Sequence, residues 1–74
     1  MKMSLNTRFI TGPGGAPLGR IEEDVDTDWG YDKMGNLVGT YNHRMDTTSD
    51  KNLMIFGQGN LLSALIVQAD DKLM

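Results

Sequence analysis

The sequence predicts an all-β protein: three consecutive β-hairpin units that form a small antiparallel meander or a barrel-like sheet. The first observation is a glycine-containing phrase that occurs three times, starting at Gly15, Gly35 and Gly59, each time after an apolar or aromatic run. The second is the alternation of polar and apolar residues over 24–32. The third is size, because 74 residues with 39% hydrophobic content fit one small folded domain that covers the whole chain.

The first unit covers residues 3–22. Polar and apolar residues alternate over 3–10, which predicts a strand with one solvent-facing side. The glycines and prolines of 11–17 either permit positive φ or fix φ, so this stretch is expected to be a turn or loop. The chain then returns as a short strand over 18–22.

The second unit covers residues 24–42, and its hairpin is the plainest in the sequence. In the first strand, the carboxylates are expected on a solvated face and the other face to carry Val25, Thr27, Trp29 and Tyr31. Residues 33–36 supply a turn, because glycine and asparagine tolerate the left-handed region. Residues 37–41 form the returning strand.

The third unit is expected at residues 53–67, after an exposed polar loop at 42–52. Within it, 53–56 is read as a strand and 57–60 as its turn. Two interpretations of the following residues stay open. By analogy with the second unit they form another strand to the end of the unit, which we favour. The leucine spacing over 61–73 is instead that of a short helix.

One segment carries a resemblance to a known family: Tyr31-Asp32-Lys33-Met34-Gly35-Asn36-Leu37-Val38-Gly39. It resembles the hairpin units of small β-hairpin-repeat proteins, such as the YD-type repeats of large secreted shells and the four-fold β-flower proteins. Units of those proteins read roughly Tyr-Asp-x-x-Gly-Asn-hydrophobic-x-Gly. The resemblance implies a β-rich structural module and brings no catalytic residues with it.

Charge and hydropathy narrow the classes of partner. The formal charge of -3 and a pI of about 4.7 repel phosphate backbones, and the seven lysines and arginines are scattered, so we expect no nucleic-acid partner. The amino terminus has no continuous apolar segment of the secretory kind. The longest apolar run, 61–67, is too short to span a bilayer. These patterns predict a soluble cytoplasmic protein without a membrane partner.

Size and composition also predict self-association. A single core of this size is near the lower limit for independent stability, and without cysteine no disulfide can supplement it. We therefore expect a homo-oligomer. The apolar residues at the two ends would contribute to it: Met1, Met3, Leu61, Leu62, Leu65, Ile66, Leu73 and Met74. The residues expected to anchor core and interface are Trp29, Leu37, Leu53, Ile55, Leu62 and Leu65.

Three aspartates at alternate positions, Asp24, Asp26 and Asp28, resemble a calcium-binding loop in their spacing. Two departures weaken this interpretation. Gly30 falls one place later than an EF-hand loop requires, and Gly35 stands where a bidentate glutamate should close the site. The favoured interpretation is a solvated strand face, so no metal or other cofactor is expected.

His43 is the one histidine, and hence the one candidate of its type for a general base. In an enzyme, an active site between subunits would use His43 as acid or base, with Arg44 or Asp46 as an orienting or anion-binding partner. An exposed loop offers little to orient or desolvate it, so the favoured interpretation is a surface histidine. No catalytic residue is therefore assigned.

Two other features receive structural interpretations. The glycine-rich run 12–15 lacks the Gly-Lys-Ser/Thr ending of a phosphate-binding loop. Trp29, Tyr31 and Tyr41 could form an aromatic ligand platform, but packing in a core or interface is the favoured interpretation. The leading hypothesis is thus a homo-oligomeric β module for binding or scaffolding, with the inter-subunit enzyme and the calcium module as alternatives.

Overall fold

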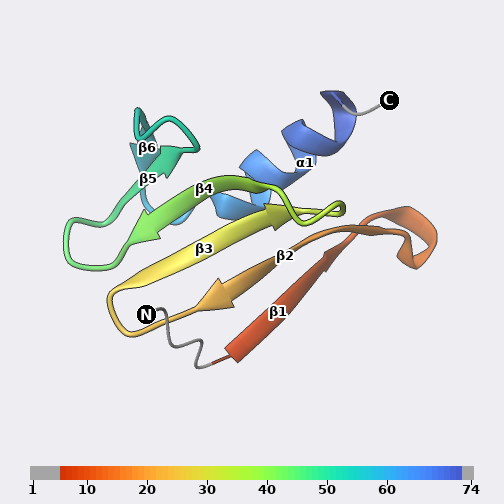
Figure 1. Cartoon of the computed structure of the whole chain (residues 1–74), viewed down its shortest axis with the longest axis horizontal. Helices are drawn as coiled ribbons and strands as arrows, with labels where there is room; N and C mark the ends of the chain where they lie inside the picture. The colour runs from red at the N-terminus through yellow and green to blue at the C-terminus, as the bar shows by residue number, and fades with distance from the viewer. Residues whose placement is uncertain (1–5, 73–74) are drawn as a thin grey trace.

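The computed structural model describes residues 6–72 as an open antiparallel sheet with one helix across one face (Figure 1). Six strands follow one another in sequence order: β1 (Asn6–Thr11), β2 (Pro17–Glu23), β3 (Thr27–Asp32), β4 (Leu37–Asn42), β5 (Thr47–Asp50) and β6 (Ile55–Gln58). A 3-10 turn, Pro13–Gly15, follows β1, and the helix α1 (Leu62–Lys72) follows β6. The predicted meander is confirmed, with β1 and β6 as its edges. Within 6–72, no helix has the length and hydropathy needed to cross a membrane.

The hairpins β1–β2, β3–β4 and β5–β6, which we call the first, second and third hairpins, share one turn geometry. In the second, the Gly35 N–H donates to the Asp32 carbonyl at 3.0 Å, and the Asp32 N–H donates to the Asn36 carbonyl at 2.9 Å. A three-residue loop whose last residue is left-handed is a type I turn with a G1 bulge. The same two bonds recur with Gly12, Gly15 and Ala16 in the first hairpin and with Asp50, Leu53 and Met54 in the third.

The third hairpin covers residues 47–58, so the predicted unit at 53–67 is wrong. Strand β5 forms inside the stretch 42–52 that was expected to be an exposed loop, and its Thr48 is fully buried. The Thr48 hydroxyl donates to the Gly59 carbonyl at 2.6 Å and accepts from the Leu61 N–H at 2.9 Å. These bonds explain why a polar residue stands in the interior.

The misassignment has a local cause. Leu53 has φ of 66° and occupies the left-handed turn position that Gly15 and Gly35 fill in the other hairpins. A leucine there hides the turn, because non-glycine residues rarely adopt this conformation. Gly59 also has positive φ, but it follows β6 and precedes the helix rather than closing a hairpin.

Residues 62–72 form a helix, so the favoured strand is wrong and the alternative is confirmed. Leu62, Leu65 and Ile66 are buried, which is the i, i+3, i+4 spacing of a helix with one apolar side. The Asn60 carboxamide accepts from the Leu62 N–H at 3.3 Å, in the manner of an N-cap.

Glycines on the covered face of the sheet let the helix approach closely. A Cβ at Gly19 would lie 2.7 Å from Ile66 Cγ2, and one at Gly39 would lie 2.6 Å from Leu65 Cδ1. A Cβ at Gly57 would likewise lie 2.5 Å from Leu61 Cδ1. These glycines occupy equivalent positions in the three hairpins, so each hairpin receives one aliphatic side chain at its own glycine.

The core is smaller than the sequence predicts. The hydrophobic residues buried in the described chain are Ile21, Leu62, Leu65 and Ile66. Of the expected anchors, Trp29 and Leu37 lie half-buried, and Leu53 and Ile55 are 79% and 69% exposed. Of the apolar end residues expected to drive association, Leu62, Leu65 and Ile66 are thus buried in the core. Residues 1–5, with the predicted strand start, and residues 73–74 lie outside the described residues.

The two faces of β3 are the reverse of the expectation. Asp28 and Asp32 are 2% and 6% exposed and lie with Gly30 on the side that α1 covers. By the alternation of the pleat, Trp29 and Tyr31 point to the opposite face. The interpretation of the carboxylates as a solvated face is therefore wrong for Asp28 and Asp32. Asp24 and Asp26 precede β3 in the connection from β2, and Asp26 is exposed. Helix packing requires a flat glycine surface, and the short aspartates at its margin are satisfied by local partners.

Candidate functional site

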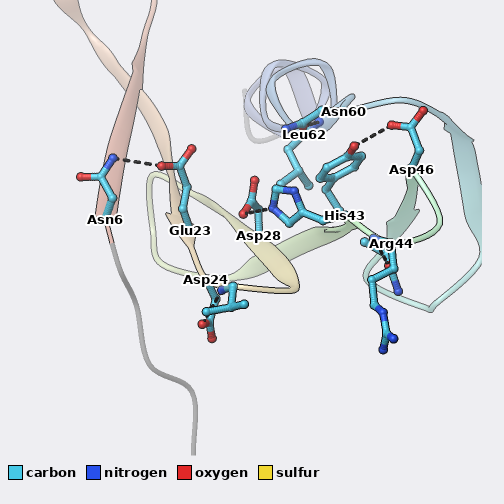
Figure 2. Close-up of polar contacts among 12 residues, drawn as sticks. Asn6, Glu23, Asp24, Asp28, His43, Arg44, Asp46, Asn60 and Leu62 are labelled. Atoms are coloured by element: carbon cyan, nitrogen blue, oxygen red, sulfur yellow. Dashed lines mark hydrogen bonds and ion pairs between the residues drawn. The ribbon is translucent and has the colours of Figure 1, made fainter.

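A polar cluster lies where β3 begins and β4 ends, beside the start of the helix (Figure 2). Its centre is the pair formed by Asp28 and His43, with 2.8 Å between Asp28 Oδ1 and His43 Nε2. The Asp28 side chain is buried, whereas 43% of the His43 side chain is exposed. The His43 N–H also donates to the Asp26 carbonyl at 3.0 Å, which fixes the loop that carries the imidazole.

Tyr41 extends this cluster on the strand side. Its ring meets the imidazole of His43 edge to face, with 4.9 Å between centroids and 76° between planes. Its hydroxyl donates to Asp46 Oδ1 at 2.6 Å. This hydrogen bond is the main cause that raises the pKa of Tyr41, followed by desolvation and by the negative charges of Asp46 and Asp28.

The arrangement can orient an imidazole. A buried carboxylate on one ring nitrogen fixes the ring and leaves the other nitrogen for proton transfer, which is the chemistry of a general acid–base. The partner differs from the sequence-based hypothesis. Asp46 is bound to Tyr41, and the Arg44 N–H donates to Asn42 Oδ1 at 2.9 Å.

The residues of the calcium hypothesis make separate local contacts. The Asp24 carboxylate accepts from the Val25 N–H at 2.7 Å, the Asp26 carbonyl accepts from His43, and Asp28 holds the imidazole. In the part of the chain that the structure describes, no group of three or more histidine, cysteine, aspartate or glutamate side chains is placed to hold a metal ion. Calcium binding stays a prediction.

A groove of about 620 Å³ lies between the turns of the second and third hairpins and the outer part of α1. Its apolar wall includes Val38, Phe56 and Leu65. The two carboxylates beside it, those of Asp32 and Asp50, already accept backbone N–H groups of their own turns at 2.9–3.1 Å. A smaller groove of about 120 Å³ lies between the first and second turns, and neither groove is lined by His43. The enzyme hypothesis therefore stays a prediction.

The aromatic residues divide between the two faces of the sheet. Tyr31 lies on the face away from the helix, where Arg20 stacks over its ring at 4.4 Å from the centroid. Phe9 pairs with Arg20 from β1 and is 71% exposed. Tyr41 packs on the helix side instead. Trp29, Tyr31 and Tyr41 consequently do not form one platform.

Among residues 6–72, the most exposed apolar segment is four consecutive residues of the third hairpin, which we call the apolar edge segment. Its members and their exposed fractions are Leu53 at 79%, Met54 at 66%, Ile55 at 69% and Phe56 at 40%. The segment includes the start of β6, an edge strand, and no charged residue occurs from Asn52 to Ala69. Consecutive exposed apolar residues on a sheet edge mark a surface suited to association.

Searches for related proteins found no match among family models, curated proteins or solved structures. The resemblance to hairpin-repeat proteins stays a prediction.

Proposed function

We propose that this protein is a self-associating β-sheet module that serves in binding or scaffolding, with further copies of itself as its partner. The observation that carries the proposal is the apolar edge segment, Leu53 to Phe56, which runs from the turn of the third hairpin into the edge strand β6. An edge strand presents unpaired backbone donors and acceptors, and here apolar side chains stand beside them.

The small core supports the same proposal. One helix covers one face of the sheet, and the buried hydrophobic cluster consists of Ile21, Leu62, Leu65 and Ile66. Domains of this size commonly need an additional source of stability, and the chain has no cysteine for a disulfide. Burying the apolar edge segment between copies supplies it through the hydrophobic effect.

The test is size-exclusion chromatography with light scattering on the full chain and on Ile55→Lys. A lysine at this exposed position places a charge on the β6 edge without disturbing the buried core. The matched control is Met34→Lys, because Met34 is an apolar residue of similar exposure, 71%, in the turn of the second hairpin and outside the apolar edge segment. We expect an oligomer for the unmodified chain and Met34→Lys, and a monomer for Ile55→Lys.

A compact monomer for the unmodified chain at micromolar concentration would overturn the proposal. An oligomer that survives Ile55→Lys unchanged would exclude the β6 edge as the interface. Circular dichroism of both variants checks that each retains the fold.

A further inference from the structure

We propose that copies join head to tail, with β6 of one copy pairing antiparallel to β1 of the next. This inference rests on the self-association proposed above and specifies which strands meet and in which register. It starts from the observation that the two free edges of the sheet belong to different ends of an internal repeat.

The repeat is structural as well as sequential. Each hairpin contains the same turn, then a register shift of one residue, then a glycine on the helix side. The shifts leave an extra residue at Leu18, Val38 and Phe56, and the glycines are Gly19, Gly39 and Gly57. The three hairpins are therefore equivalent residue by residue, although the third has little sequence similarity to the other two.

The pairing between successive hairpins obeys one rule. The glycine of one hairpin stands opposite the first turn residue of the next: Gly19 opposite Asp32, and Gly39 opposite Asp50. The residue after each glycine continues the register, with Arg20 opposite Tyr31 and Thr40 opposite Ser49. The pairing of β2 with β3 and the pairing of β4 with β5 thus have the same register.

The third hairpin and the first hairpin of another copy hold the residues that would continue this rule. In the third hairpin they are Gly57 and Gln58, and in the first they are Gly12 and Thr11. The rule places Gly57 opposite Gly12 of the next copy and Gln58 opposite its Thr11. Gln58 and Thr11 are exposed, so both are accessible to a partner.

The third hairpin, which no further hairpin follows, differs from the first two in the burial of its extra residue. Leu18 and Val38, the extra residues of the first two hairpins, are partly buried against the core cluster. Their equivalent, Phe56, is 40% exposed. On the other edge, Phe9 of β1 is 71% exposed. In this register Phe56 and Ile55 lie beside the Pro13–Gly15 turn of the next copy, which would provide the neighbour that the third hairpin lacks.

The charges of the two edges permit this contact. β6 carries no charge, and Arg8 is the one charged residue of β1. Because the two surfaces differ, the contact is heterologous, and it closes into a ring or extends as a filament according to the rotation between copies. A β6–β6 contact would instead give a symmetric dimer.

Because the chain has no cysteine, disulfide cross-linking reports on the introduced cysteines alone. Thr11→Cys and Gln58→Cys are prepared as separate chains, mixed, and oxidised. Directly opposite residues in an antiparallel pair have Cα atoms about 4.5–5.5 Å apart, within the range that a disulfide spans. The matched control is the equivalent pair within one chain, Thr40→Cys with Ser49→Cys, which should form an intrachain disulfide.

We expect the mixture to give a disulfide-linked dimer of one chain of each kind, with little cross-linking in either variant alone. Cross-linking of Gln58→Cys with itself would overturn the head-to-tail arrangement in favour of a symmetric contact, while self-association would stand. An oligomer whose mixed chains fail to cross-link, although the control pair does, would overturn the register. A monomer by light scattering would instead refute the proposed function itself.

Discussion

Gly39 lies directly beneath Leu65: a Cβ at this position would lie 2.6 Å from Leu65 Cδ1 and 2.5 Å from the Ser49 carbonyl oxygen. The helix can rest on the sheet because no side chain occupies this point. In the first two hairpins the repeated phrase therefore has a second role: its second glycine, Gly19 or Gly39, keeps the helix side of the hairpin flat.

Gly39→Ala should lower the free energy of unfolding by about 2–3 kcal/mol, because the new methyl group meets backbone as well as Leu65. Urea denaturation measures the change. Gly57→Ala is the matched control, since its Cβ would meet the terminal Leu61 Cδ1 alone, which can move aside. That variant should lose about 1 kcal/mol or less. Equal losses would contradict the role assigned to Gly39.

Leu53→Gly should stabilise the monomeric fold by roughly 0.5–1 kcal/mol, because Leu53 holds a φ of 66° that glycine adopts without steric cost. Denaturation at low protein concentration separates this effect from association. Gly35→Ala, at the equivalent turn position, should show the opposite sign. A loss of stability in Leu53→Gly would show that its exposed side chain makes a contact worth more than the backbone strain.

The pair of Asp28 and His43 should be measurable in a double-mutant cycle with Asp28→Asn and His43→Ala. Removing the imidazole leaves the buried carboxylate without this partner, so His43→Ala should cost about 1–2 kcal/mol more with Asp28 present than in the Asp28→Asn background. Chemical denaturation of the four proteins at neutral pH gives the coupling energy. Additive effects would mean that the contact contributes nothing.

The raised pKa of Tyr41 predicts a loss of stability at alkaline pH. The folded protein holds the phenol proton more tightly than the unfolded chain does, because Asp46 accepts its hydrogen bond. The contribution is therefore complete below the usual tyrosine pKa of about 10 and is lost as the pH rises through the folded value.

Phenolate absorbance during an alkaline titration tests this prediction. Asp46→Asn should lower the pKa of Tyr41 toward the ordinary value, and Tyr41→Phe identifies which of the two tyrosines titrates. An unchanged titration in Asp46→Asn would contradict the assigned cause.

The first two hairpins could be predicted because their turn positions carry the residue that the backbone requires. Gly15 and Gly35 both have positive φ, and their spacing places the flanking strands correctly. The third could not, because Leu53 occupies the same position without the chemical signature, while Gly59 imitates it. Turn chemistry identifies a hairpin where the sequence follows the local preference and misleads where it does not.

The alternation of polar and apolar residues could not by itself predict which face of the sheet is buried. The strand pattern distinguishes two faces, but it does not say which one the helix covers. In β3 the covered face carries glycine between two aspartates, and the aromatic residues lie opposite. Hydropathy predicts the reverse, because it takes no account of how closely a helix can approach a glycine.

The candidate site could also be predicted only in part from the sequence. His43 was identified by its chemistry, and the expected hairpin brings Asp28 opposite Tyr41, two residues before His43. Its partner was assigned among sequence neighbours, whereas the contact comes from the adjacent strand. The contact between Asp28 and His43 can be predicted from the strand register, but not from proximity in the sequence.

The position of α1 after all six strands has a consequence for how this protein matures. Of the hydrophobic side chains buried in the described residues, only Ile21 is synthesised before the helix. Nascent hairpins emerging from a ribosome would have local turns but almost no interior to hold them in place. Completion of the fold must therefore wait for the helix, and chaperones that recognise exposed apolar chain would meet the hairpins before the helix does.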